Sequence, residues 1–492
     1  MRQAPFWAFT RPPLTLPQFV DSKNTKKLEV RNPKDDSLVA NDIALAGEAD
    51  VEAAVEAASA AFKTWRKTSA KQRRDLLNRL ADLIDANAEA IAELTRVTLG
   101  APMASFGTFE VALAAESLRY FAGFTDKFPG EVYPEEDGFL KIVRNEPLGV
   151  CAGIVPWNGP SANVGMKAGP ALATGNVFIL KPSEKTPFSA LALAALAKEA
   201  GFPPGVFQVL PGDGSTGALL ASHMKIGKVS FTGSTATGRK IQEMAAKSNL
   251  KRVTLELGGK SPAVVFDDAD LENAITWCVN AITANTGQVC FAASRVYVQE
   301  GIYDRFVEGY KAAMEQRATL AGDPDAEGTI LGPLVDKSQF ERVSGFLERG
   351  KSQGTLLTGG GRIGTDVSLP SLPLSLSLSL LYHALLTPLP GLLRPADHLP
   401  KRRRGRRDRQ AGDLRPRLHP QQVQDGGGDP RQGQRHVLRA HGGRLHAGHQ
   451  PGAALRRGPR VGHGGHQRGE HGLPAGAVWR EQDVGDRARE CD

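Results

Sequence analysis

The sequence predicts an α/β fold whose core is a parallel, doubly wound sheet. Between residues 149 and 257, short apolar runs typical of buried strands alternate with segments of helical periodicity. This order favours a parallel sheet with helices on both faces, because parallel strands need long crossover connections. Residues 1–366 are also nearly neutral, with 40 Lys and Arg against 42 Asp and Glu, as expected for a globular region.

The individual elements follow from these patterns. The expected strands are residues 149–155, 176–180, 206–210, 228–232 and 252–257. The expected helices are residues 50–61, 70–99, 187–200, 215–223 and 235–248. The segment 70–99 is predicted as one helix, because Leu77, Leu80 and Ile84 recur at helical spacing. A second α/β stretch is expected from Ala263 to about Thr358, with Gly359–Thr365 as a loop after it.

Residues 367–492 differ in composition from the rest of the chain. They contain 21 Lys and Arg against 11 Asp and Glu, and ten of the eleven His, but no Ile, Phe, Asn or Met. The excess behind the net charge of +8 therefore lies entirely here, which excludes a uniformly basic nucleic-acid-binding protein. The abundance of Arg, Gly, Pro and His predicts a disordered, low-complexity tail.

One part of this tail imitates a membrane span. Residues 367–393 contain twelve Leu and no Asp, Glu, Lys or Arg, and the basic run Lys401–Arg407 follows them. Four Pro interrupt the run, however, and each Pro inside a helix costs roughly 3 kcal/mol. The sequence therefore predicts no membrane partner and no nucleic-acid partner. The disfavoured alternative is a protein that binds nucleic acid or a membrane surface through Arg402–Arg409.

Cysteine usage and the N-terminal residues bear on the compartment. Four Cys in 492 residues do not make a disulfide framework, and without a C-x-x-C pair no metal site is predicted. The first twenty residues contain four Pro and no long apolar stretch, so no secretory signal is predicted. A cytoplasmic protein is expected. Arg2 and Arg11, with no acidic residue before Asp21, leave a mitochondrial protein as the alternative.

Cys290 is the first candidate for chemistry. A lone Cys is more often a small buried hydrophobic residue than a nucleophile. Here, however, Gly287 and Gln288 stand shortly before it, as in a turn that exposes a side chain. Glu256 ends one predicted strand and Asn158 follows another. A thiol, a carboxylate and a carboxamide are the nucleophile, base and oxyanion donor that an acyl-thioester mechanism needs.

Two further segments point to a nucleotide. Phe231–Lys240 places glycines between a strand and a helix, where backbone N–H groups and the helix N-terminus suit a phosphate. Arg239 stands where a P-loop carries Lys, so a simple helix N-cap by Ser234 or Thr235 is the alternative. Lys181–Glu184 ends a strand at the carboxyl edge, where open α/β sheets bind ligands, although such Lys–Glu pairs are often only solvated.

Taken together, five segments resemble the NAD(P)-dependent aldehyde dehydrogenase superfamily. In chain order they are Pro156–Asn158, Lys181–Glu184, Phe231–Gly238, Glu256–Lys260 and Asn285–Cys290. The resemblance runs from about Phe19 to Thr365 and includes Gly332–Gln339. It implies a Rossmann-like NAD-binding domain over residues 1–255 and the start of an α/β catalytic domain over residues 256–366.

The resemblance implies oxidation of an aldehyde to a carboxylic acid. Cys290 would attack the carbonyl, Asn158 and the Cys290 backbone N–H would hold the oxyanion, and Glu256 would activate the water that hydrolyses the thioester. The cofactor would be held by Lys181, Glu184, Trp157, Gly233, Ser234, Gly238 and Leu257. Because a carboxylate on the ribose hydroxyls repels a 2′-phosphate, Glu184 favours NAD over NADP. The family also implies a homo-oligomer.

After Thr365 the resemblance stops, and the family motifs E-x-F-G-P and P-F-G-G-x-K-x-S-G are absent from the printed sequence. If each codon is read from its second base, Ala411–Arg417 can encode the first motif and Ala477–Glu490 the second. The resulting hypothesis is a retained intron from about Val367, followed by translation in the wrong frame. The alternative function is therefore a catalytically inactive family member that at most binds NAD.

Overall fold

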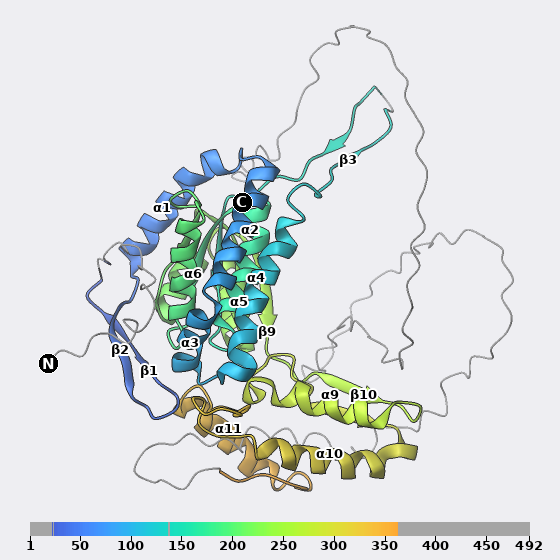
Figure 1. Cartoon of the computed structure of the whole chain (residues 1–492). Helices are drawn as coiled ribbons and strands as arrows, with labels where there is room; N and C mark the ends of the chain where they lie inside the picture. The colour runs from blue at the N-terminus through green and yellow to red at the C-terminus, as the bar shows by residue number, and fades with distance from the viewer. Residues whose placement is uncertain (1–21, 23, 136–137, 363–492) are drawn as a thin grey trace, which may run out of the picture. The chain divides into compact units, whose positions relative to one another are not determined.

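The computed structural model describes residue 22 and residues 24–135 and 138–362 (Figure 1). The predicted disordered tail, the retained intron and the rejected membrane span fall on residues 367–492, outside these ranges, as do Arg2 and Arg11. Within the described ranges, no helix has the length and the apolar character that a membrane-spanning segment requires.

A five-stranded parallel sheet occupies the centre of the fold, in the order β7-β6-β5-β8-β9. Its strands are β5 (Val150–Ile154), β6 (Val177–Lys181), β7 (Phe207–Val209), β8 (Ile226–Gly233) and β9 (Arg252–Leu257). The chain order runs outward in both directions from the neighbours β5 and β8, which confirms the predicted doubly wound sheet. Every residue of β5 and β6 is buried, as expected for strands covered on both faces.

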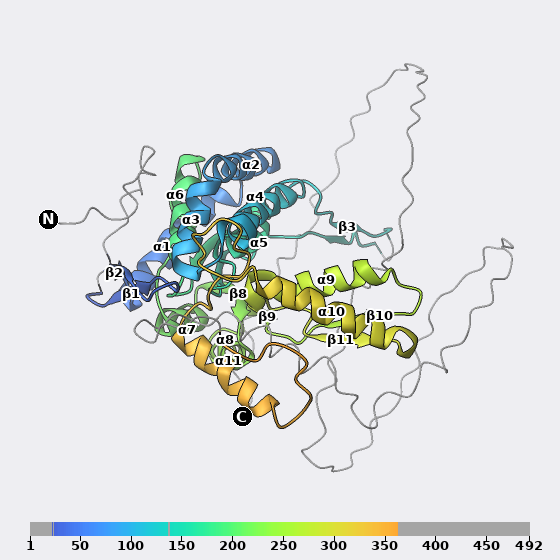
Figure 2. The same cartoon turned by 60° about the horizontal axis from the view of Figure 1, so that its bottom comes forward.

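Helices from the crossover connections cover this sheet. They are α5 (Pro160–Ala173), α6 (Phe188–Glu199), α7 (Gly214–Ser222) and α8 (Thr235–Ala246). Helix α5 contacts β5 and β6, α6 contacts β7, and α8 contacts β8 and β9. Figure 2 shows α5 and α6 on one side of the strands and α7 and α8 on the other.

A second layer of helices packs on α5 and α6. It comprises α2 (Ala70–Ala86), α3 (Ala88–Leu99) and α4 (Thr108–Ala122). The predicted single helix over 70–99 is wrong, because the chain leaves helical geometry at Asn87 (φ −115°, ψ 17°). The Asn87 side-chain amide donates to the Leu83 carbonyl at 2.8 Å, a local bond that competes with continuation of the helix. Leu77, Leu80 and Ile84 are buried, as their spacing predicted.

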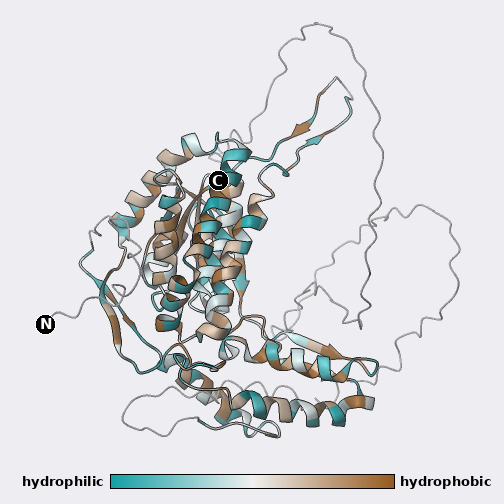
Figure 3. Cartoon of the chain, in the orientation of Figure 1, coloured by the Kyte–Doolittle hydropathy of each residue, from teal (hydrophilic) through white to brown (hydrophobic). Residues whose placement is uncertain are grey.

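The N-terminal part adds an antiparallel pair, β1 (Lys27–Arg31) and β2 (Leu38–Ala44), and helix α1 (Glu48–Trp65), which contacts β5 and β6. A short hairpin of β3 (Glu131–Val132) and β4 (Ile142–Val143) follows α4. It extends away from the helices, and its strands carry apolar residues (Figure 3). Val132, Phe139 and Leu140 are 71%, 66% and 67% exposed, so the hairpin presents apolar surface.

After the central sheet, β10 (Pro262–Val265), α9 (Leu271–Thr283) and β11 (Arg295–Val298) form a parallel β-α-β unit. Helix α10 (Tyr303–Ala318) packs on α9, and α11 (Lys337–Gly350) follows. Residues of β10, β11, α9 and α10 share a separate hydrophobic core. The boundary predicted after residue 255 falls inside β9, because Glu256 and Leu257 still pair with Thr232 and Gly233 of β8.

Candidate active site

The candidate residues gather around the carboxyl ends of the central strands. Pro156–Asn158 follows β5, Ser234 follows β8, and Gly258–Lys260 follows β9. Because the strand order reverses between β5 and β8, the carboxyl ends of these two strands border the crevice in which doubly wound sheets bind ligands. The loop that carries Cys290 comes from the next unit and reaches the same region through contacts with Asn158.

Cys290 is exposed, whereas Cys151 in β5 and Cys278 in α9 are buried. Burial raises the pKa of the Cys151 thiol to about 12 and that of the Cys278 thiol to about 11. A Cβ placed on Gly259 would lie 3.4 Å from the Cys290 carbonyl oxygen. The turn after β9 therefore approaches the Cys290 backbone, which brings the ends of two predicted catalytic segments together.

Asn158 is tied to the Cys290 loop by two hydrogen bonds. Its side-chain amide donates to the Gln288 carbonyl at 2.8 Å, and the Asn285 side-chain amide donates to the Asn158 carbonyl at 3.1 Å. The predicted oxyanion donor, Asn158, is therefore bonded to Gln288, which precedes the predicted nucleophile by two residues.

Glu256 lies on the exposed face of β9. Sequence reasoning missed a neighbour of this carboxylate, Lys167 of α5, which is buried and donates to the Ser230 hydroxyl at 2.8 Å. Burial lowers the pKa of Lys167 to about 8, and the negative charge of Glu256 opposes that shift. The signal in the sequence was a single Lys within the otherwise uncharged helix Pro160–Ala173.

The predicted ribose-binding pair is present as an ion pair. The Lys181 ammonium lies 3.7 Å from the Glu184 carboxylate, and it donates to the carbonyls of Pro182 (2.7 Å) and Gly212 (2.6 Å). Lys181 is almost fully buried, while the Glu184 side chain is 44% exposed. Burial lowers the pKa of Lys181, and the charge of Glu184 opposes the shift. Of the two side chains, Glu184 is the one accessible to a ligand.

The predicted phosphate loop begins helix α8. The Ser234 hydroxyl accepts a hydrogen bond from the Thr237 N–H at 3.2 Å, so the N-cap alternative describes its contacts in this structure. A Cβ on Gly238 would lie 2.8 Å from a methyl group of Leu257, and one on Gly233 would lie 2.5 Å from the Phe231 ring. Gly238 therefore allows the close packing of α8 against β9, and Gly233 leaves room for the Phe231 ring of its own strand.

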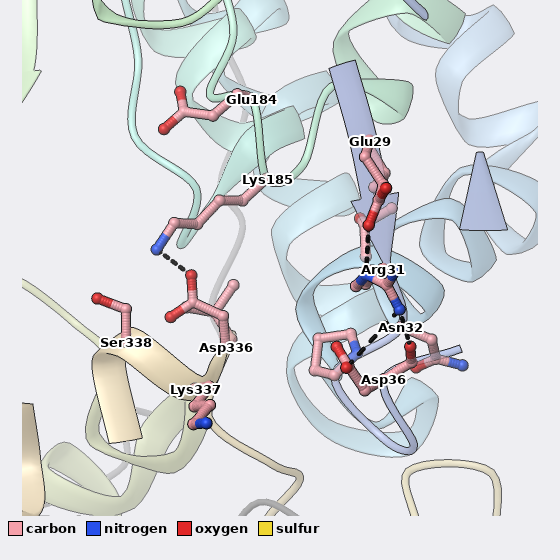
Figure 4. Close-up of a pocket in the computed structure, with 13 residues that line it drawn as sticks. Glu29, Arg31, Asn32, Asp36, Glu184, Lys185, Asp336, Lys337 and Ser338 are labelled. Carbon is pink, nitrogen blue, oxygen red and sulfur yellow. Dashed lines mark hydrogen bonds and ion pairs between the residues drawn. The ribbon is translucent and has the colours of Figure 1, made fainter. Parts of the chain in front are cut away.

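A cavity of about 300 Å³ lies beside Glu184 and Lys185, between β1 and the start of α11 (Figure 4). Lys185 and Asp336, which both line it, form an ion pair, and the Lys185 ammonium lies 5.8 Å from the centre of the Trp157 ring. The lining includes neither Cys290 nor Glu256. The cavity therefore adjoins Glu184, one of the two predicted ribose-binding residues, and the sequence patterns did not predict it.

The sequence model of the aldehyde dehydrogenase family matches residues 19–369. The chain belongs to the aldehyde dehydrogenase family. A mitochondrial aldehyde dehydrogenase of Leishmania tarentolae is 46% identical over 349 residues, 70% of each chain. The cytosolic aldehyde dehydrogenase 1 of Mus musculus is 44% identical over 349 residues, 70% of this chain and 69% of the relative. An NAD⁺ complex of a Bacillus cereus aldehyde dehydrogenase superposes with a TM-score of 0.67 at 40% identity, covering 71% of both chains.

Aldehyde dehydrogenase membership confirms three predictions: the superfamily, the α/β fold class, and an oxidoreductase that oxidises aldehydes with NAD(P). The family match ends at residue 369, close to the predicted end of the resemblance at Thr365.

Proposed function

We propose that this chain carries the active site of an NAD-dependent aldehyde dehydrogenase in which Cys290 is the nucleophile. The observation that carries the proposal is the exposure of Cys290 on a loop bonded to Asn158, while Cys151 and Cys278 are buried. An exposed thiol can meet a substrate, whereas buried thiols with raised pKa values are inert near neutral pH.

In the first step the Cys290 thiolate adds to the aldehyde carbonyl carbon, and the carbonyl oxygen becomes an oxyanion. A carboxamide has two N–H donors. The Asn158 amide directs a donor to the Gln288 carbonyl, so its other N–H serves the oxyanion together with the Cys290 backbone N–H. One such donor is commonly worth a factor of about 100 to 1,000 in rate.

The chemistry that bound NAD would supply is acceptance of the hydride that leaves the thiohemiacetal carbon. A thioester would then remain on Cys290, and Glu256 would take a proton from the attacking water; the carbon–sulfur bond breaks, which releases the carboxylic acid and returns the Cys290 thiolate. Two observations support this role for Glu256. It is exposed near the end of β9, and the glycine turn that follows approaches the Cys290 backbone.

The residues present fit a dinucleotide. The first turn of α8 is exposed, and its N-terminus suits a pyrophosphate contacted by Ser234. The exposed Glu184 carboxylate can accept both hydroxyls of the adenosine ribose, and the buried Lys181 orients it. The walls of the cleft would come from Trp157, Gly233, Gly238 and Leu257. A 2′-phosphate would meet the charge of Glu184, so we propose NAD rather than NADP.

The wider organisation is also a proposal. Residues 1–255, with Glu256 and Leu257 completing β9, would form the NAD-binding domain, and the residues that follow up to 366 would form the start of the catalytic domain. The partner would be a small-molecule aldehyde, with neither nucleic acid nor membrane bound. The exposed apolar hairpin β3–β4 supports a homo-oligomer, because large exposed apolar patches mark interaction sites. A cytoplasmic location is proposed, with the mitochondrion as the alternative; the relatives include enzymes of both compartments.

The test measures NADH formed from NAD and an aldehyde, by the chain as written and by a form restored to the offset frame after removal of residues 367–393. The restored form should produce NADH, Cys290→Ala in that form should abolish it, and the control Cys278→Ala should retain it. Full activity in Cys290→Ala would reject the nucleophile. The alternative function, an inactive NAD-binding family member, predicts that the chain as written binds NAD without forming NADH.

A further inference from the structure

The backbone just before Cys290 passes through three consecutive residues with positive φ. The φ values are 49° at Asn285, 56° at Thr286 and 76° at Gly287. Glycine adopts this region readily, but a β-branched residue such as Thr does so at a cost of about 1–3 kcal/mol. Such a turn persists only where the surrounding structure holds it, so its contacts identify what shapes the Cys290 loop.

Gln288 bridges this turn with both ends of its side chain. Its Nε2 donates to the Asn285 carbonyl at 3.1 Å, and its Oε1 accepts from the Val335 N–H at 3.0 Å. Its backbone carbonyl accepts the 2.8 Å bond from the Asn158 amide. Gln288 is only 8% exposed, so these bonds are shielded from water. One residue thus links the turn, the segment at Val335 and the proposed oxyanion donor.

The segment that Gln288 binds is itself held in place. The Thr286 hydroxyl donates to the Gly332 carbonyl at 3.0 Å, three residues before Val335. Gly332 lies so close to the Gly100 carbonyl that no side chain would fit there. Asp336 forms the ion pair with Lys185 that Figure 4 shows. The anchor for Gln288 is therefore tied to the helix layer and to the loop after β6.

Building on the proposed function, we propose that Gln288 is a positioning residue for the oxyanion site. Its side chain determines where the backbone leading to the Cys290 N–H lies, and its carbonyl holds the Asn158 amide. The two oxyanion donors come from segments 132 positions apart in the sequence, and Gln288 sets their relative position. Gln288 acts through these donors and does not itself touch the substrate.

Two reactions at the same thiol separate this role from general support of the fold. In acylation by p-nitrophenyl acetate, the Cys290 sulfur adds to the ester carbonyl through an oxyanion. The sulfur–carbon bond forms, and p-nitrophenolate leaves with the electrons of the broken carbon–oxygen bond. In alkylation by iodoacetamide, the sulfur displaces iodide and no oxyanion arises. Both reactions need the thiolate, so the ratio of their rates reports on the oxyanion donors alone.

The experiment compares the full chain with Gln288→Met, which keeps the volume and removes both side-chain bonds, and with Thr286→Val, which removes the hydroxyl bond to Gly332. The matched control is Gln208→Met, because the Gln208 amide donates to the Ala54 carbonyl at 2.9 Å, remote from Cys290. Mass spectrometry of the Cys290 peptide gives both rates. Neither reaction requires NAD or turnover of an aldehyde.

For Gln288→Met, the ratio of acylation to alkylation should fall about 10- to 100-fold, the scale of a donor misplaced by about 1 Å. Thr286→Val should lower the ratio in the same direction, and Gln208→Met should not change it. An unchanged ratio in Gln288→Met, or an equal loss of both rates, would overturn the inference. A parent chain that is alkylated but never acylated at Cys290 would instead reject the proposed oxyanion site, and the inference with it.

Discussion

The carboxylate of Glu110 accepts a hydrogen bond of 2.9 Å from the backbone N–H of Ser161, in the first turn of α5. The same oxygen accepts another from Ala162 at 2.9 Å, and the other oxygen accepts from the Thr95 hydroxyl at 2.7 Å. Glu110 is fully buried. The start of α5, which directly follows the loop of Trp157 and Asn158, is therefore held by a carboxylate from α4.

Replacing Glu110 tests this support. Glu110→Ala should lower the free energy of unfolding by about 3 kcal/mol or more, because it leaves buried N–H groups unpaired and opens a cavity. Glu110→Gln retains an acceptor for both N–H groups and should cost far less. Urea unfolding followed by circular dichroism measures both variants, and equal losses in the two would contradict the hydrogen-bond explanation.

The Glu110→Gln variant also carries a pH prediction. Burial raises the pKa of Glu110, so the folded chain keeps this proton at pH values where the unfolded chain has lost it. The stabilisation is present below the pKa of the unfolded chain and is lost as pH rises through the folded pKa. The parent should therefore lose stability relative to Glu110→Gln as pH increases above about 4.5. A stability difference between the two proteins that does not change with pH would contradict the raised pKa of Glu110.

The cysteines should differ in reactivity. With pKa values of about 12 and 11, Cys151 and Cys278 remain protonated near neutral pH, and both are buried. Cys290 is exposed, so iodoacetamide near neutral pH should label Cys290 before either of them. Peptide mass spectrometry distinguishes the sites, including Cys491 in the tail. Preferential labelling of Cys151 or Cys278 would contradict the assignment of the nucleophile.

Cofactor preference should depend on Glu184. The parent should bind NAD more tightly than NADP, because the 2′-phosphate would face the exposed Glu184 carboxylate. Glu184→Gln removes that charge and should narrow the gap between the two affinities. Calorimetry with both cofactors measures it, with Glu199→Gln as a control on a different glutamate. Equal affinities in the parent would count against the role of Glu184.

Lys167 should make the free energy of unfolding increase with pH in the alkaline range. Burial lowers its pKa to about 8 from 10.5, so folding carries the cost of a buried charge below pH 8 and loses that cost by about pH 10.5. Stability of the parent should therefore rise relative to Lys167→Met across this interval. Thermal unfolding at several pH values measures the difference. The exposed Lys247→Met serves as the control, and the same trend there would refute the attribution to Lys167.

The residues after 366 should lower the solubility and the activity of the chain as written. Among the described residues, the apolar side chains of Val264, Phe266 and Trp277 are 57%, 52% and 58% exposed, which favours aggregation. The frame-restored form should be more soluble and should reduce NAD faster with the same aldehyde. Soluble yield and NADH formation, measured side by side, decide this. Equal turnover by the two forms would mean that the printed sequence after Val367 has a different role.

Local sequence patterns were sufficient to predict the bounds of an element where that element buries a single stretch of apolar side chains. Strand β9 spans Arg252–Leu257, the range predicted, and α6 and α8 differ from prediction by one or two residues at their ends. The helix over 70–99 failed, because apolar periodicity continues across Asn87 while its side chain bonds the backbone and interrupts the helix. Periodicity therefore identified the buried face but not the break.

The sequence by itself determined the family, the doubly wound sheet and the set of candidate residues, because apolar periodicity and short motifs depend on neighbours along the chain. Only the tertiary structure decided that Cys290 is exposed while Cys151 and Cys278 are buried. It also decided that Lys167 lies near Glu256 and that Gln288 joins Asn158 to the Cys290 loop. The last two relationships connect residues that are 89 and 130 positions apart in the sequence. Their energies come from burial and hydrogen bonds that exist only once the chain has folded.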